Sequence, residues 1–193
     1  MSDIKAKILA TRDQFRELVW PMWCDRFGSS ELISVEGSDR PFEQRADTGG
    51  IDAFFARRKD GVIIPLASRI EYATSDDIEV SRRLRRRFTV RSQKLDQNGW
   101  HKNTELRRLL LAAKDPISRR YLPYRTFHTL LSKDKSIVLF TSAVCTERFC
   151  DYLLTEVTEK RYQEQTTRDG DAKFLVIYVD ALRAGNIDVE SMP

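Results

Sequence analysis

Two neighbouring stretches that both have the character of β-strands constrain the fold of this chain most. Residues 51–58 and 62–72 are largely apolar, and Asp60-Gly61 stands between them. An Asp-Gly pair between two apolar runs is a strong local signal for a β-hairpin with a two-residue turn. The chain is therefore expected to contain an antiparallel pair of strands, around which the remaining elements pack.

Apolar periodicity predicts further helices and strands on both sides of this hairpin. Helices are expected at residues 13–27, with Pro21 kinking or dividing the helix and Gly28 ending it, at 103–115 and at 146–160. Strands are expected at residues 87–92, 124–131, 136–142 and 173–179. This order predicts an α+β or mixed α/β fold with a mixed central sheet flanked by helices. We expect a single domain over residues 1–193, with a core from about 13 to 180 and a tail from 181 to 193.

Composition narrows the class of protein. The chain has 193 residues, of which 41% are hydrophobic, and this is enough for one domain with a substantial core. No apolar run approaches the roughly 20 residues of a membrane-spanning helix, and the N-terminus has no apolar signal core. Three cysteines without CxxC spacing argue against a disulfide scaffold or a zinc knuckle. We therefore expect a cytoplasmic protein that does not contact membranes.

The positive charge is concentrated in one sector of the chain. Between Arg82 and Arg125 there are fourteen Lys and Arg against three acidic residues, a net +11, whereas the whole chain carries +4 and the remainder therefore −7. A basic sector in a nearly neutral chain is typical of a protein that binds a polyanion, and the guanidinium group suits phosphate. The alternative is a solvated face balanced by the acidic remainder. The candidate contacts to the backbone of nucleic acid, most naturally duplex DNA, are Arg85, Arg86, Arg87, Arg91, Arg107 and Arg108.

The hairpin is expected to place three charged side chains together. With a two-residue turn, Asp52 lies opposite Arg69 and diagonal to Glu71, on the face away from the apolar side chains. Two carboxylates beside a cation can hold Mg²⁺, which binds one or two carboxylates together with waters and phosphate oxygens. The alternative is a cross-strand salt bridge from Asp52 to Arg69, with Glu71 in solvent.

These segments resemble the PD-(D/E)XK nuclease superfamily, whose restriction-endonuclease-like core has the order α-β-β-β-α-β. In that family an acidic residue at the start of one hairpin strand precedes an (E/Q)-x-K tripeptide on the next. Residues 48–55 (TGGIDAFF) resemble the first element, 66–71 (LASRIE) occupy the second, and 88–91 (FTVR) resemble the third strand that accompanies them. The similarity spans about residues 15–111. It implies an endonuclease that hydrolyses DNA phosphodiester bonds with Mg²⁺ or Mn²⁺.

Carried over by position, Asp52 matches the metal-binding aspartate and Arg69 the catalytic lysine, while Ala67 stands where the family has Glu or Gln. Because a methyl group cannot bind metal, Glu71 is the candidate for a migrated second ligand, and Arg69 is expected to hold the scissile phosphate. The alternative is a nuclease-like fold that binds DNA or a protein partner without cleaving. An enzyme that cuts both strands would naturally be a homodimer.

Other signals are weaker. Glu17 on the first helix resembles the extra acidic residue that some members contribute. His101 and His128 show no partner pattern and are expected to be structural or exposed. Arg69, Ser142 and either Glu147 or Glu159 resemble ADP-ribosyltransferases loosely, which leaves that activity as a minor alternative.

Overall fold

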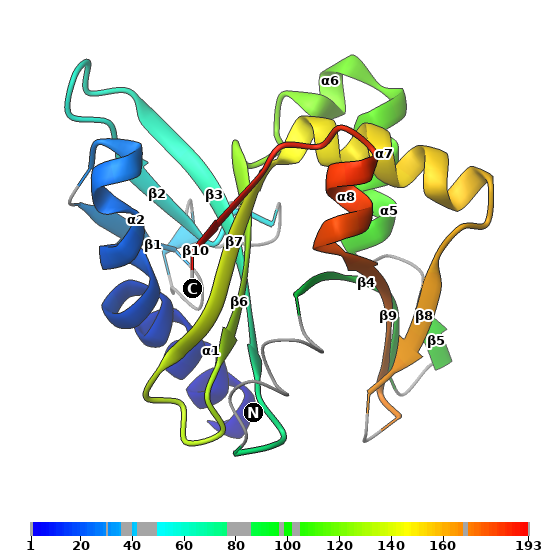
Figure 1. Ribbon diagram of the computed structural model, residues 1–193, viewed down its shortest axis with the longest axis horizontal. Coiled ribbons are helices and arrows are strands. Elements are labelled where there is room, and N and C mark those ends of the chain that lie inside the picture. Colours follow the sequence, from blue (N-terminus) through cyan, green and yellow to red (C-terminus); the bar gives the residue numbers. More distant parts are fainter. Residues whose placement is uncertain are drawn as a thin grey trace. The chain divides into compact units, whose positions relative to one another are not determined.

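The structure is a computed structural model that describes residues 2–29, 31–35, 40–41, 50–76, 86–96, 99–101, 105–167 and 170–192, with the backbone alone for residues 2–5, 96, 100 and 101. The chain divides into two compact units. The first comprises Met1–Leu84, Pro123–Ala143 and Glu190–Pro193, and the second comprises Arg85–Leu122 and Val144–Val189. Both units combine helices with β-strands (Figure 1). The predicted α+β class is confirmed, with two sheets where the sequence analysis expected one.

The N-terminal helical segment is divided, as the proline indicated. Helix α1 (Ser2–Gln14) leads into a π-helical turn, η1 (Phe15–Val19), and then into α2 (Trp20–Phe27), in which Pro21 stands in the first turn. Proline lacks an N–H group and its ring crowds the preceding turn, so a wider π turn accommodates it. Gly28 ends α2 in the left-handed conformation at φ 61°, where glycine is favoured.

The first unit contains a mixed six-stranded sheet. Its order is β1-β2-β3-β6-β7-β10, with bounds β1 (Leu32–Ser34), β2 (Ala53–Ala56), β3 (Ile63–Tyr72), β6 (Arg125–Leu131), β7 (Val138–Cys145) and β10 (Val189–Met192). Strand β2 pairs antiparallel with β1 and β3, whereas β3 pairs parallel with β6. Residues 181–193, expected as a tail, contribute to a C-terminal helix and form β10 at the sheet edge.

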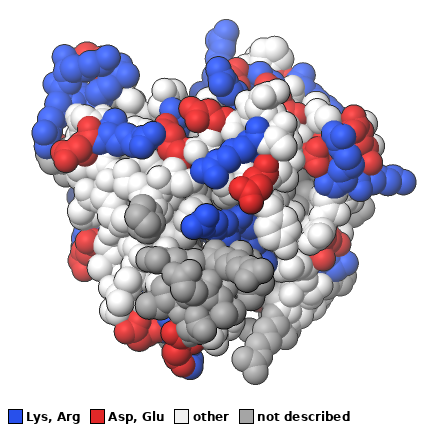
Figure 2. Space-filling model, in the orientation of Figure 1, with Lys and Arg blue, Asp and Glu red and all other residues white. Residues whose placement is uncertain are grey.

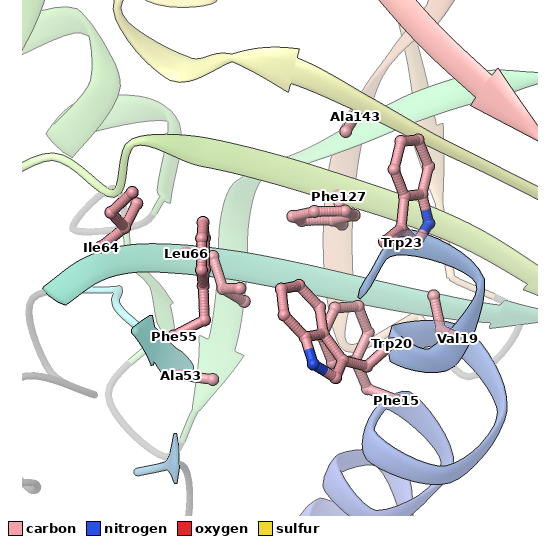
Figure 3. Packing of buried hydrophobic residues seen from close by; sticks show 10 residues of the cluster. All are labelled: Phe15, Val19, Trp20, Trp23, Ala53, Phe55, Ile64, Leu66, Phe127 and Ala143. Carbon is pink, nitrogen blue, oxygen red and sulfur yellow. The ribbon is translucent and has the colours of Figure 1, made fainter. Parts of the chain in front are cut away.

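One face of this sheet packs against the helical segment (Figure 3). Val19, Trp23, Leu66 and Phe127 are fully buried there. The rings of Trp23 and Phe127 meet edge to face, with centroids 5.3 Å apart. The remaining buried members of this core are Phe15, Trp20, Ala53, Phe55, Ile64 and Ala143. Burial of these aromatic and aliphatic side chains supplies the main driving force for this unit.

The hairpin forms, but its register differs by two residues from the prediction. Ala53 pairs with Leu66, where a two-residue turn would pair it with Ser68. The loop is longer because Gly61 N–H donates to the Arg57 carbonyl (2.8 Å) and Arg57 N–H donates to Val62 (3.0 Å). A shift of two preserves the faces of both strands, since side chains alternate with a period of two. It changes which residues lie opposite one another.

The second unit contains a four-stranded sheet in the order β5-β4-β9-β8. Its strands are β4 (Arg87–Asp96), β5 (Gly99–His101), β8 (Gln163–Thr166) and β9 (Ala172–Tyr178), and its helices are α5 (Glu105–Lys114), α6 (Pro116–Arg119), α7 (Thr146–Thr158) and α8 (Val179–Ala184). The sheet packs against α7 through Phe88, whose ring centroid lies 5.5 Å from that of Phe149.

The strand expected to accompany the hairpin therefore lies in another sheet. Strand β4 pairs with β5 and β9, while β3 has β2 and β6 as its neighbours. The restriction-endonuclease-like core stays a prediction. No helix in the described ranges is long and apolar enough to cross a membrane.

Candidate functional site

The sheet of the first unit has a second face that carries polar side chains. Tyr72 donates through its hydroxyl to Gln14 of α1 (2.7 Å), so the even-numbered residues of β3 face the helices. Because side chains alternate along a strand, Ala67, Arg69 and Glu71 lie on the opposite face. We call this face of the first sheet the polar face.

Asp52 lies directly before β2 and is held by hydrogen bonds to the backbone of β3. Its N–H donates to the Leu66 carbonyl (2.9 Å), and its Oδ2 accepts a hydrogen bond from Ser68 N–H (2.6 Å). The pairing of β2 with β3 ends at Ala53 and Leu66, so these two hydrogen bonds, and not the ladder, fix Asp52. They hold the Asp52 carboxylate against the backbone of Ser68, the residue before Arg69 in β3.

Glu71 does not join Asp52, which corrects the predicted cluster. Asp52 binds the N–H of Ser68, and Glu71 lies three residues beyond Ser68, which at about 3.3 Å per residue is about 10 Å along the strand. The error arose from the assumed two-residue turn, which shifted the predicted register of β3 by two residues and so placed Glu71 too close to Asp52. The two carboxylates are thus not a pair for one metal ion.

Glu71 has a different neighbour, His128 of β6. The His128 side chain is 1% exposed, and its Nε2 lies 3.5 Å from Glu71 Oε1. His128 is also the register partner of Arg69 in the parallel pairing of β3 with β6. Arg69, Glu71 and His128 therefore lie together in the middle of the sheet. Polar and charged side chains in such a position are costly unless they have partners.

Two buried hydroxyl side chains extend the polar face. Thr126 is the register partner of Ala67, on the same face of β6 as His128. Ser142 of β7 is fully buried. Its neighbour Thr141 accepts a hydrogen bond from Trp23 Nε1 (3.2 Å) and therefore faces the helices, so Ser142 lies on the polar face.

Sequence reasoning missed His128 and Thr126 as members of this site. The available signal was their alternation in strand 125–131, where two polar residues flank Phe127. Such alternation indicates a strand with two different faces. Placing His128 beside Arg69 also required the parallel pairing of β3 with β6, which joins residues 59 positions apart.

The polar face offers one carboxylate for a magnesium ion at Asp52. Mg²⁺ is bound in proteins by one or two carboxylates together with waters and substrate phosphates. Asp52 alone therefore fits a magnesium site with a single carboxylate ligand. Ser68 N–H orients this carboxylate, and a carboxylate has acceptor capacity for more than one partner. Across the described ranges, no three or more His, Cys, Asp or Glu side chains gather in a group that could hold a metal ion.

The predicted nucleic-acid contacts all belong to the second unit, and Arg85 lies outside the described residues. Arg86 is exposed. Arg87 and Arg91 lie four residues apart on one face of β4, opposite to the face of Phe88. Arg87 donates to Gln165 (3.0 Å), and the Arg91 guanidinium lies 5.9 Å from the ring centroid of Phe174.

Arg107 and Arg108 of α5 do not join that face. Arg107 is exposed and lines an open groove of about 460 Å³ together with Leu175, on the side of the sheet that α5 covers. Arg108 lies near Cys150 of α7, and its positive charge acts to lower the pKa of the buried Cys150 thiol. The predicted set is therefore divided between two sides of the second sheet.

The remaining candidates have structural neighbours. Glu17 is exposed and pairs with Arg16 at 2.9 Å, on the helical segment that covers the other face of the first sheet. In the second unit, Glu147 accepts from Arg119 (3.1 Å) and Glu159 pairs with Arg161 (2.8 Å). These ion pairs give no specific support to an ADP-ribosyltransferase.

Comparison with known proteins adds no family assignment. The chain matches no protein-family model, no curated protein and no solved structure. The resemblance to PD-(D/E)XK nucleases therefore stays a prediction that rests on the residues themselves.

Proposed function

We propose that the chain binds nucleic acid and hydrolyses its phosphodiester backbone, with Asp52 and Arg69 at the reacting site. The observation that supports this most is the hydrogen bond that holds the Asp52 carboxylate at Ser68 N–H, one residue before Arg69, whose register partner is the buried His128. Folding alone favours apolar side chains in such a place, since buried charges cost stability. Polar or charged side chains in a place that favours apolar ones are expected at functional sites.

Each group has a distinct role in this proposal. Arg69 binds the scissile phosphate, because a guanidinium matches the geometry of two phosphate oxygens. Asp52, oriented by Ser68 N–H, is the carboxylate that would hold Mg²⁺ or Mn²⁺. When bound, such an ion supplies an activated water and neutralises charge on the phosphate. Glu71 and His128 position Arg69 in the sheet and are not ligands of the ion held by Asp52.

Nucleic acid as the substrate is supported by the basic sector of the sequence. Arg86 is exposed, and Arg87 and Arg91 share a face with Phe174. Cations beside an aromatic ring suit phosphates and bases together. Duplex DNA is the first substrate to test, with RNA as the second, and a homodimer is the assembly expected if both strands are cut.

The experiment is cleavage of supercoiled plasmid and of a labelled RNA by the purified chain in Mg²⁺, Mn²⁺ or EDTA. The test variant is Asp52→Asn, which keeps an acceptor for Ser68 N–H but removes the charge. The matched control is Asp76→Asn, at an exposed residue paired with Lys133. We expect metal-dependent cleavage in the wild type and the control, and none in Asp52→Asn. Equal cleavage by all three proteins would contradict the role of Asp52.

A second candidate function is binding of nucleic acid without cleavage. It is favoured by Ala67, which stands two residues before Arg69, at the position where the resembling family carries Glu or Gln. Under this alternative, no substrate is cut in any metal, and the affinity for nucleic acid is the same in Mg²⁺ and in EDTA.

A further inference from the structure

The tip of the β2–β3 hairpin is held by several hydrogen bonds. Gly61 adopts a left-handed conformation at φ 67°, and no atom lies within 4 Å of the position its Cβ would occupy. The Arg57 guanidinium binds the Asp60 carboxylate through two hydrogen bonds of 2.9 and 2.5 Å. Arg58 N–H donates to the Gly28 carbonyl (2.8 Å), which ties the tip to the end of α2. These hydrogen bonds define the conformation of the tip without a ligand.

Two cationic side chains at this tip, Arg58 and Lys59, are exposed to solvent. Arg57 and Asp60 neutralise one another, whereas the side chains of Arg58 and Lys59 are exposed and form no ion pair with the described residues. Figure 2 shows Lys and Arg side chains gathered at this tip, at the upper left. The tip therefore presents a local charge of about +2.

The other hairpin turn of the first unit provides a contrast. Between β6 and β7, the ammonium group of Lys133 pairs with Asp76 at 3.0 Å. That of Lys135 lies 5.0 Å from the ring centroid of Tyr72. These two lysines have partners within the protein, whereas the exposed side chains of Arg58 and Lys59 are accessible to an external anion.

An apolar path leads from the tip to the candidate site. Ile63, which pairs with Ala56, is 54% exposed and lies on the polar face. The next pair on that face joins Pro65 to the half-buried Phe54, and Asp52 lies directly before β2. A chain lying along this face would have cations at one end, apolar surface in the middle and Asp52 at the far end.

We propose that the tip of the β2–β3 hairpin binds the phosphate backbone of a nucleic acid that runs over Ile63 and Phe54 toward Asp52. This inference rests on the proposed function and adds a substrate contact outside the basic sector. Preformed geometry lowers the entropic cost of binding, and apolar or aromatic surface beside cations suits bases next to phosphates.

The experiment compares Arg58→Gln/Lys59→Gln with the control Lys133→Gln/Lys135→Gln, which removes the same charge from the other turn. Binding of a fluorescent duplex and of a fluorescent single strand is measured by anisotropy from about 50 to about 200 mM KCl, in EDTA to prevent cleavage. Each lost phosphate contact lowers the slope of log affinity against log salt by about one. We expect the tip variant to lose about two in slope, with an affinity at least about tenfold lower at low salt. The control should keep the wild-type slope.

Each outcome decides between the alternatives. Equal slopes for the tip variant and the control overturn the tip contact while leaving nucleic-acid binding intact. A wild-type protein that binds neither strand form overturns the proposed function, and the tip contact with it. Vesicles of phosphatidylserine test the other source of anionic phosphate: loss of vesicle binding in the tip variant, with unchanged nucleic-acid binding, would assign the tip to lipid instead.

Discussion

The Nε2 atom of His128 lies 3.5 Å from Oε1 of Glu71, and the two side chains are 1% and 17% exposed. They come from adjacent parallel strands whose pairing also sets His128 beside Arg69. Solvent screens an interaction between side chains in such a position less than one at the surface.

The first prediction is a large coupling energy between Glu71 and His128. A double-mutant cycle with Glu71→Ala and His128→Ala should give about 1–3 kcal/mol in the free energy of unfolding, measured in urea. The control cycle uses Arg57 and Asp60, which form closer contacts (2.5 Å) but are exposed and screened by solvent. A coupling no larger than that of the exposed pair would contradict the prediction.

The second prediction concerns two adjacent residues of β7 with opposite expected effects. Thr141 Oγ1 accepts from Trp23 Nε1 (3.2 Å) and contacts Thr129 Oγ1 (3.0 Å), so Thr141→Val leaves buried polar groups without a partner. We expect a loss of about 1–3 kcal/mol in the free energy of unfolding. Ser142 Oγ is buried and has no hydrogen-bond partner among the described residues. Ser142→Ala should therefore leave stability unchanged or raise it by about 1 kcal/mol.

Urea unfolding followed by tryptophan fluorescence measures both β7 variants. Because the two residues are neighbours on one strand, any general effect of altering β7 is shared. Equal destabilisation by both would show that Ser142 makes a stabilising contact.

The sequence was sufficient for local features of the fold. The end of α2 at Gly28 follows from the left-handed preference of glycine, and α7 begins at Thr146 as predicted. The two faces of the hairpin were also predicted, because alternation along a strand depends on the strand alone. Features of this kind are determined by residues close together in the chain.

Other features depend on interactions that pattern alone does not encode. The length of the hairpin turn depends on the contact of Arg57 with Asp60, which favours a loop longer than two residues. The parallel pairing of β3 with β6 and the place of β4 in another sheet depend on distant segments. For this reason the sequence did not reveal that Glu71 lies beside His128, and it placed Glu71 with Asp52 instead.

The third prediction is a dependence on pH at the start of α6. Asp115 caps this helix by accepting from the N–H groups of Ile117 (3.1 Å) and Ser118 (3.0 Å) and from the Ser118 hydroxyl (2.6 Å). These hydrogen bonds, the hydroxyl first, lower the pKa of the Asp115 carboxyl below its usual 3.8. A depressed pKa in the folded state means that the cap stabilises the helix above pH 3.8. This stabilisation is lost as the pH falls through the lowered value.

An NMR titration of the Asp115 side-chain carbon checks this expectation. The amide signals of Ile117 and Ser118 should shift with the same midpoint, below pH 3.8. Asp115→Asn keeps an acceptor for the cap but cannot titrate, so the amide shifts should lose this midpoint. A midpoint at or above the usual value would contradict the assigned hydrogen bonds.

The fourth prediction is that Cys150 does not react with thiol reagents while the protein is folded. Burial, with a smaller effect of the neighbouring Asp151 charge, raises the pKa of the Cys150 thiol to about 12. The thiolate is the reactive form, and at pH 8 it makes up about one part in ten thousand of such a thiol. Cys24 and Cys145 are partly exposed, so iodoacetamide should modify them first.

Trypsin separates the two cysteines near the start of α7, because it cuts after Arg148 and leaves Cys145 and Cys150 in different peptides. Mass spectrometry should find the Cys150 peptide alkylated in urea and unmodified in native buffer. Cys150→Ala is the control, and it should leave the native labelling of Cys24 and Cys145 unchanged. Native labelling of Cys150 at the rate of Cys145 would contradict the predicted protection of this thiol.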